Sequence, residues 1–125
     1  MKIKLDPLDK IYSEFIRCRA IKLVHGCERC LTWKEKYTDL QTAHFYGRSK
    51  KNLRYDIDNG VGLCGACHMY FHSHPNEFTE WVKAHLGEGA FDLLNARTRV
   101  TEKVDKELVT LFLRQLIKEL ENDNL

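Results

Sequence analysis

The sequence predicts an α+β fold in a single domain, and three observations lead to this class. Five cysteines stand within the first 67 of the 125 residues, and four of them form two C-x-x-C pairs. Apolar residues recur at helical spacing before and after these pairs. Two short stretches between the pairs have strand-like composition. We therefore expect an N-terminal helix within residues 1–26, a cysteine-rich core at 27–75 and C-terminal helices at 76–125.

The paired cysteines predict a metal centre. The pairs are Cys27/Cys30 and Cys64/Cys67, with 33 residues between them. Four thiolates in this pattern supply a closed tetrahedral site, which is the usual arrangement for structural zinc, Zn2+. The odd cysteine count and a start without a signal-peptide-like apolar stretch argue against a disulfide framework. Cys18 falls within a helical pattern and is expected to be a small core residue.

Residues 7–24 are predicted to form a helix because their apolar side chains recur at offsets of three and four. Asp6 is a suitable N-cap, Pro7 fits the first helical turn, and Gly26 indicates the end of the helix. The apolar face of this helix consists of Leu8, Ile11, Tyr12, Phe15, Ile16, Ala20 and Leu23.

Two short strands and a helix are predicted on the way to and beyond the second cysteine pair. Residues 39–46 read as a weakly alternating strand, and residues 61–63 form a second one after the turn at Asn59-Gly60. A helix over residues 65–72 follows directly. The core is therefore expected to have the order strand, strand, helix.

Three further helical segments are predicted beyond Pro75. Asn76 is expected to cap a helix that Gly87 ends, and a helical turn follows at residues 90–95. The last helix, over about residues 101–121, has a wide apolar face that the N-terminal helix or a second copy in a homodimer would cover. Its main stripe is Val104, Leu108, Leu111, Phe112, Leu116 and Leu120, which Val109, Leu113 and Ile117 widen.

Three of the six histidines lie just after the second cysteine pair. His68 and His72 are four residues apart, so on a helix their imidazoles share one face and can chelate one cation. Because His68 follows Cys67, a zinc-bound turn would fix its backbone, and a second metal site beside the first is expected. The alternative is that both rings cap the helix or face solvent. His74 is a reserve candidate as ligand or phosphate contact.

A longer pattern joins these histidines to His44 and Asn59, with the spacing H-x14-N-x8-H that ends at His68. The second cysteine pair lies in N-x-x-x-L-C-x-x-C-H, in which the leucine is Leu63. In these features the sequence resembles the HNH endonucleases whose ββα-metal core is supported by a four-cysteine zinc. The likeness covers roughly residues 27–74. The A-H-F at the first histidine is similar to phage recombination nucleases of the NinG (Rap) type.

The resemblance implies a hairpin and a helix that hold one divalent cation, Mg2+, Mn2+, Ni2+ or Zn2+. His44 would be the general base that takes a proton from the attacking water, a role that suits an imidazole near neutral pH. Asn59 would hydrogen-bond the backbone of the loop bearing His44 and orient the ring. His68, also a catalytic residue, and His72 would bind the cation, which would neutralise the scissile phosphate and the leaving oxygen. The implied reaction is hydrolysis of DNA phosphodiester bonds in phage or bacterial recombination or DNA processing.

One position departs from the family pattern. Many relatives carry an Asp or His metal ligand immediately before the base, where this sequence has Ala43. Either His68 and His72 hold the ion with waters and phosphate, or His44 is itself a ligand and the base is another group. We interpret His44 as the base.

A basic segment follows the first predicted strand, although the formal net charge of the chain is only +2. Positive charges flanked by Tyr46 and Tyr55 favour a loop that follows a DNA phosphate backbone. A guanidinium binds phosphate through two hydrogen bonds, so the first arginine is the best candidate for a clamp. The alternative is a solvated loop. The basic residues are Arg48, Lys50, Lys51 and Arg54.

Two other functions fit part of the pattern. A non-catalytic treble-clef zinc module that binds DNA or protein would share the cysteine pairs, hairpin and helix, and Ala43 keeps this alternative open. A thiol redox protein would use one C-x-x-C pair without zinc. No apolar run approaches ~18 residues, so no membrane span is expected. Without a leader, the chain is expected in the cytoplasm, that of the bacterial host cell if it is phage-encoded.

Overall fold

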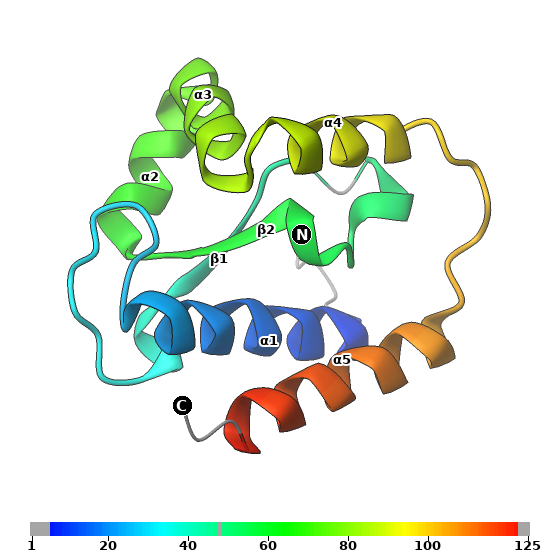
Figure 1. The fold of residues 1–125 in the computed structure, drawn as a ribbon, viewed down its shortest axis with the longest axis horizontal. Coiled ribbons are helices and arrows are strands. Elements are labelled where there is room, and N and C mark those ends of the chain that lie inside the picture. Colours follow the sequence, from blue (N-terminus) through cyan, green and yellow to red (C-terminus); the bar gives the residue numbers. More distant parts are fainter. Residues whose placement is uncertain (1–5, 48, 123–125) are drawn as a thin grey trace, which may run out of the picture.

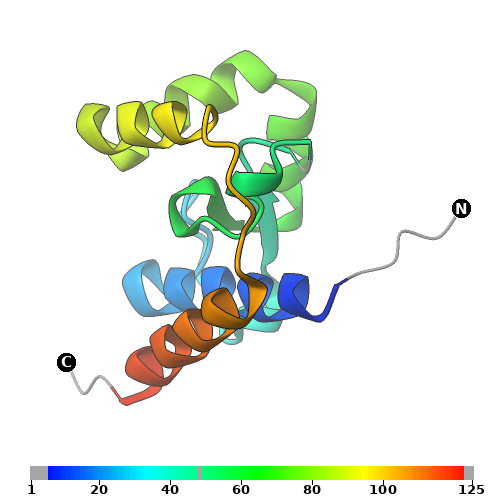
Figure 2. The same ribbon diagram turned by 90° about the vertical axis from the view of Figure 1, so that its right-hand side faces the viewer.

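The computed structural model describes residues 6–47 and 49–122, which form a mixed α+β structure (Figure 1). A two-stranded sheet lies between two groups of helices, with α1 and α5 on one side and α2, α3 and α4 on the other (Figures 1 and 2). The elements are α1 (Pro7–Val24), β1 (Gln41–His44), β2 (Gly60–Leu63), α2 (Gly65–Ser73), α3 (Pro75–Leu86), α4 (Glu88–Arg97) and α5 (Lys106–Asn122).

Helix α1 has the limits that its sequence predicts. The Asp6 carboxylate accepts a hydrogen bond from the Leu8 amide, and the Asp9 carboxylate accepts one from the Asp6 amide. This capping box satisfies amides that the first turn leaves without helical partners. The helix ends at His25, which adopts the left-handed conformation with φ of 54°. The predicted N-cap and helix are therefore confirmed.

The sheet is an antiparallel hairpin in which His44 pairs with Gly60 and Ala43 pairs with Val61. Strand β1 is shorter than the predicted segment 39–46, because only four residues keep partners on β2. Helix α2 begins directly after β2, and the Cys64 sulfur caps it by accepting a hydrogen bond from the Cys67 amide. The predicted order of strand, strand and helix is thus observed.

Helix α1 lies unusually close to β2, and two glycines make this approach possible. A Cβ added at Gly62 would lie 2.7 Å from the Cβ of Ala20, and one at Gly60 would lie 2.5 Å from the Tyr12 hydroxyl. Both distances are shorter than van der Waals contact. The side chains of Tyr12 and Ala20 on α1 therefore pack directly onto the backbone of β2.

We expect Gly62→Ala to lower the free energy of unfolding by roughly 1–3 kcal/mol, because overpacking forces the helix away from the strand. Gly89→Ala is the matched control, since an added Cβ there meets nothing within 4 Å and the residue lies inside helix α4. It should instead raise the stability by about 0.5–1 kcal/mol. Urea unfolding of both variants measures the two effects, and equal shifts would contradict the close packing.

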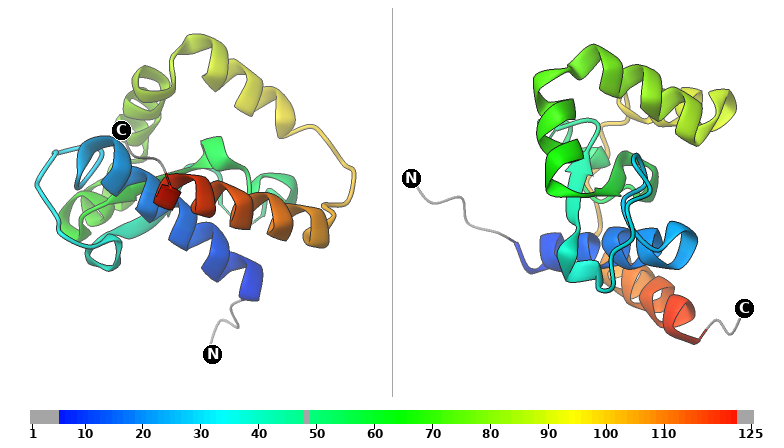
Figure 3. Two further views of the ribbon diagram at one scale, coloured as in Figure 1. Left: turned by 60° about the horizontal axis from the view of Figure 1, so that its bottom comes forward. Right: turned by 90° about the vertical axis from the view of Figure 1, so that its left-hand side faces the viewer.

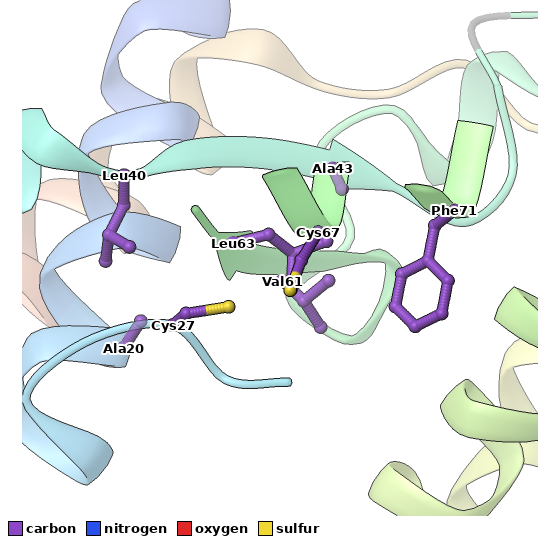
Figure 4. Packing of buried hydrophobic residues seen from close by; sticks show 8 residues of the cluster. All are labelled: Ala20, Cys27, Leu40, Ala43, Val61, Leu63, Cys67 and Phe71. Atoms are coloured by element: carbon purple, nitrogen blue, oxygen red, sulfur yellow. The ribbon is translucent and has the colours of Figure 1, made fainter. Parts of the chain in front are cut away.

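The buried core is divided into two clusters. One joins the hairpin to α2 and the cysteines, and it includes Ala43 of β1 and Phe71 of α2 (Figure 4). The other lies between α1 and α5, where Leu113 is fully buried, and Figure 3 shows α5 crossing α1. The first cluster contains the cysteine site, and the second holds the terminal helices together.

Helix α5 is covered by α1, but only part of the predicted main stripe is on the covered face. The buried side is centred on Leu113, whereas Leu108, Leu111 and Phe112 are 63%, 65% and 51% exposed. Both faces of this helix are apolar, so periodicity alone did not distinguish them. The residues packed against α1 or its neighbours are Val109, Leu113, Leu116, Ile117 and Leu120.

The start of α3 also differs from the prediction. Pro75 is its first residue and His74 its N-cap, so Asn76 lies inside the first turn and does not cap the helix. Proline suits this position because the first helical amide has no partner to lose. Gly87 ends α3 with φ of 86°, as expected. Within the described residues, no helix combines the length and apolar character needed to cross a membrane.

Candidate functional site

The four paired cysteines meet at one point in the structure. Their sulfur atoms all lie within 4.8 Å of one another, and Cys30 and Cys64 are 3.8 Å apart between sulfurs. A tetrahedron with zinc–sulfur bonds of about 2.3 Å has edges of about 3.8 Å. The donor set, its number and its spacing therefore fit a structural Zn2+ held by Cys27, Cys30, Cys64 and Cys67.

The first cysteine pair sits on a tight turn that only particular residues allow. The Cys27 amide donates to the Thr32 carbonyl, and the Leu31 amide donates to the Cys27 carbonyl. Leu31 has φ of 61°, and a Cβ at Gly26 would lie 2.0 Å from the Thr32 oxygen. Glycine is thus required where the two arms of the turn cross.

The thiols differ in acidity according to their surroundings. Burial raises the pKa of Cys67 to about 12 and also raises that of Cys27. The Thr32 hydroxyl hydrogen-bonds Cys30 and lowers its pKa to about 6. Zinc binds thiolates, so its binding must expel protons from the two buried thiols. Cys18 stands outside the cluster, half-buried, with its pKa raised to about 11 by burial, which makes it an unreactive thiol.

A buried glutamate fixes the first cysteine turn to the sheet. Glu28 donates its amide to the Gly62 carbonyl, and its carboxylate accepts from the Gly62 amide at 2.6 Å. The other carboxylate oxygen lies 3.0 Å from Nε2 of His85 on α3. The sequence does not predict this link, because no motif or periodicity connects positions 28, 62 and 85.

Asn59 is fully buried and fastens the loop that follows His44. Its Oδ1 accepts a hydrogen bond from the Tyr46 amide at 2.7 Å, and its Nδ2 donates to the carbonyls of Tyr46 and Leu53 at 2.9 and 3.0 Å. Its own carbonyl accepts from the Phe45 amide. Asn59 thus holds the backbone of the two residues that follow His44.

Three long side chains hold the segment that presents Asn59. Tyr12 donates its hydroxyl hydrogen to the Asp56 carbonyl at 2.6 Å, and Arg19 donates to the carbonyls of Ile57 and Gly60. Arg97 of α4 pairs with the carboxylate of Asp56 and with that of Asp58. The arginines have no sequence signal of their own, because their partners lie about 40 residues away.

His44 lies on the face of β1 that is turned toward α1. Its ring stacks on Tyr12, with ring centroids 5.2 Å apart, and its Nε2 atom is buried. Thr42 shares this face, since its hydroxyl lies 2.7 Å from that of Ser13 on α1. Because alternate residues of a strand face opposite sides, Gln41 and Ala43 are turned toward α2.

His68 and His72 lie on α2, on the other side of the sheet. Nδ1 of His68 is 2.6 Å from Oε1 of Gln41, which ties the imidazole to β1. Burial and the neighbouring His72 lower the pKa of His68, so its ring stays neutral, the form that binds metal. Among the described residues, however, only the four cysteines form a group of three or more close metal-binding side chains.

The basic segment is only partly available to a ligand. Arg54 donates two hydrogen bonds to the Asp9 carboxylate and stacks on Tyr55, so its guanidinium supports the fold. This differs from the predicted DNA contact and has a simple cause, because α1 brings a carboxylate against the loop. Lys50 and Lys51 are exposed. Arg48 lies outside the described residues.

We expect Asn59→Ala to destabilise the protein by roughly 2–4 kcal/mol, because it leaves buried backbone groups without partners. Asn76→Ala, an exposed change in the first turn of α3, is the matched control and should have little effect. Urea unfolding measures both. A cost for Asn59→Ala as small as that of the control would show that these hydrogen bonds do not hold the loop.

The structure thus gathers the four cysteines, joins Asn59 to the loop after His44, and holds His44 and His68 toward opposite faces of β1. Searches against protein-family models, curated proteins and solved structures found no match to this chain.

Proposed function

We propose that this chain is a metal-dependent HNH endonuclease that hydrolyses DNA phosphodiester bonds. The observation that carries the proposal is the position of Asn59. The side-chain amide of Asn59 is fully buried, and its three hydrogen bonds go to backbone groups. Two are made to Tyr46, shortly after His44, and one to Leu53, earlier in the loop that leads to Asn59. An unspecialised hairpin loop needs no such support, whereas a general base needs a fixed backbone.

The proposed site lies along the outer edge of β1. In the described part of the chain, β1 pairs with β2 on one edge only, and Figure 3 shows it at the outside of the sheet between α1 and α2. A phosphodiester along that edge would have His44 on the α1 side and His68 on the α2 side. Of the two nitrogens of His44, Nε2 is buried, so Nδ1 is the one that would take the proton from water.

His68 and His72 would hold the divalent cation, which supplies charge neutralisation at the phosphate and the leaving oxygen. The hydrogen bond between His68 and Gln41 keeps one ligand ring aimed at the edge of β1. Tyr12 restricts the ring of His44 from its buried side. The zinc on the four cysteines would have a structural role, because it would join the turn before the hairpin to the start of α2.

One observation favours a second candidate, a non-catalytic treble-clef zinc module. Ala43 is buried in the cluster that includes Phe71, and it supplies no third ligand beside His68 and His72. In such a module the same zinc and hairpin would present a surface to DNA or to a protein.

Cleavage of supercoiled plasmid DNA separates the two candidates. The wild-type protein, with zinc retained, is incubated with Mg2+, Mn2+, Ni2+ or Zn2+ in turn, on plasmid, linear duplex and four-way-junction DNA. Nicking that requires one of these ions supports the endonuclease. No cleavage with any ion, on any of the three DNAs, would leave the binding module as the function.

A homodimer through α5 remains part of the proposal. Its support is the exposed row of Leu108, Leu111 and Phe112, which lies on the side of α5 away from α1. Two copies would suit paired cuts in the two DNA strands. Light scattering of the purified protein gives the mass directly, and a monomer at all concentrations would remove the dimer from the proposal.

A further inference from the structure

An open groove of about 580 Å3 runs between α1 and β1. His44 and Thr42 line it from the strand, while Lys10, Ser13 and Arg17 line it from the helix. These helix positions fall three and four residues apart, so α1 presents them along one face. The wall opposite the candidate base is therefore built by a helix outside the segment that carries the family pattern.

The orientation of His44 makes this groove its route to a substrate. Tyr12 covers one face of the imidazole and is itself only 1% exposed, which closes the inner side. The edge of the ring that is not buried borders the groove. A phosphate that reaches His44 must therefore lie against the helix residues as well.

The contacts of the Arg17 side chain position its guanidinium to bind an anion. Its Nε donates to the Ser13 carbonyl at 3.1 Å, and its guanidinium lies 5.0 Å from the centre of the Tyr37 ring. Within the residues that the structure describes, its two terminal nitrogens make no hydrogen bond. A guanidinium fixed by stacking, with its donors unused, is suited to bind phosphate through two bonds.

Two acids also line the groove, and the structure reduces the effect of both. Asp9 accepts hydrogen bonds from Arg54 on both carboxylate oxygens. Glu14 accepts one from the Tyr37 hydroxyl at 3.3 Å. The charged lining residues, Lys10 and Arg17 against Asp9 and Glu14, sum to zero, and Arg54, which pairs with Asp9 without lining the groove, brings the local balance to +1. With both acids engaged, Lys10 and Arg17 are the charged lining groups that remain for a phosphate.

We infer that this groove binds the DNA backbone, with Arg17 and Lys10 contacting phosphates that flank the bond next to His44. The inference rests on the proposed function, since it names where that function holds its substrate. Ser13 lies between the two cations on α1, and its hydroxyl is 2.7 Å from that of Thr42 on β1. Contacts of this kind position DNA without reading its sequence, so the binding is independent of base composition.

The test is binding of a short fluorescein-labelled duplex, measured by anisotropy over a salt series without added divalent cation. Arg17→Gln should weaken binding about tenfold, the loss of one charge-assisted hydrogen-bonded contact. It should also reduce the slope of log K against log salt by about one, and Arg17→Lys should restore the slope. Lys83→Gln, which removes an equal charge from α3, is the control and should leave affinity unchanged.

The outcomes separate this inference from the proposed function. If the wild type nicks plasmid and Arg17→Gln binds DNA as the wild type does, the groove is not the binding site while the endonuclease stands. If no protein nicks DNA but Arg17→Gln alone lowers the salt slope, the groove is supported and the chain is a binding module. Equal losses of DNA affinity for Arg17→Gln and Lys83→Gln would show that only general surface charge matters, and would overturn the inference.

Discussion

Cys67→Ser is expected to unfold the hairpin and α2, whereas Cys18→Ser leaves the protein folded. A zinc ion on the four cysteines would join the turn near residue 27 to the start of α2, in addition to the hydrogen bonds that Glu28 makes with Gly62. Structural zinc contributes roughly 10–16 kcal/mol in small zinc-bound domains. A domain of this size has a total stability of about 5–15 kcal/mol. Loss of one ligand therefore removes a share of the stability that the small core does not replace.

Circular dichroism and zinc content measure this result together. Cys67→Ser should bind less than one zinc per chain and lose its cooperative thermal transition. Cys18→Ser changes the same side-chain atoms at a half-buried position outside the cluster, so it should keep one zinc and cost at most about 1 kcal/mol. Chelation of the wild type should reproduce the Cys67→Ser spectrum. A cooperative, zinc-free fold would show that the metal is dispensable.

His44→Ala is expected to lower the rate of plasmid nicking by roughly 10²- to 10⁴-fold, the usual contribution of a general base. The affinity for DNA should change little, because the phosphate contacts proposed for Arg17 and Lys10 remain. His44→Gln fills most of the space beside Tyr12 without supplying a base in the relevant pH range, and it should lose activity equally. Agreement between the two variants separates loss of the base from loss of packing.

The control for His44 is His25→Asn. His25 is exposed at the end of α1 and has a positive φ, a conformation that asparagine tolerates. This variant should nick plasmid at the wild-type rate. If His44→Ala and His44→Gln retained that rate with metal present, His44 would not be the base, and its buried place beside Tyr12 would be structural.

Local signals predicted the parts of the fold that depend on neighbouring residues. Asp6, Pro7 and a regular apolar spacing define α1 to the residue, since caps and periodicity act within one or two turns. The cysteine pairs predicted their own cluster, because tetrahedral binding needs little beyond the spacing of each pair. The hairpin and α2 followed from the same segment.

Long-range pairing explains what the sequence did not predict. The Glu28 carboxylate meets His85 across 57 residues, and Arg54 meets Asp9 across 45. Charged side chains have no periodic signature, so their partners depend on how complete elements pack. The same holds for α5, where two apolar faces compete and only contact with α1 selects the one around Leu113. The candidate base shows the same limit. The spacing of the motif predicted His44, but the groove that His44 faces depends on how α1 packs.

The contact between α1 and α5 affects how the chain folds during its synthesis. Lys106 at the start of α5 forms an ion pair with Asp6, 100 residues earlier in the chain. On the ribosome, α1 therefore emerges long before its cover and exposes the face around Phe15 and Ile16. Because contacts between sequence-distant segments close slowly, we expect the cysteine centre to assemble before α5 docks. A nascent chain stopped before α5 would still carry all four paired cysteines but present an uncovered helix to chaperones.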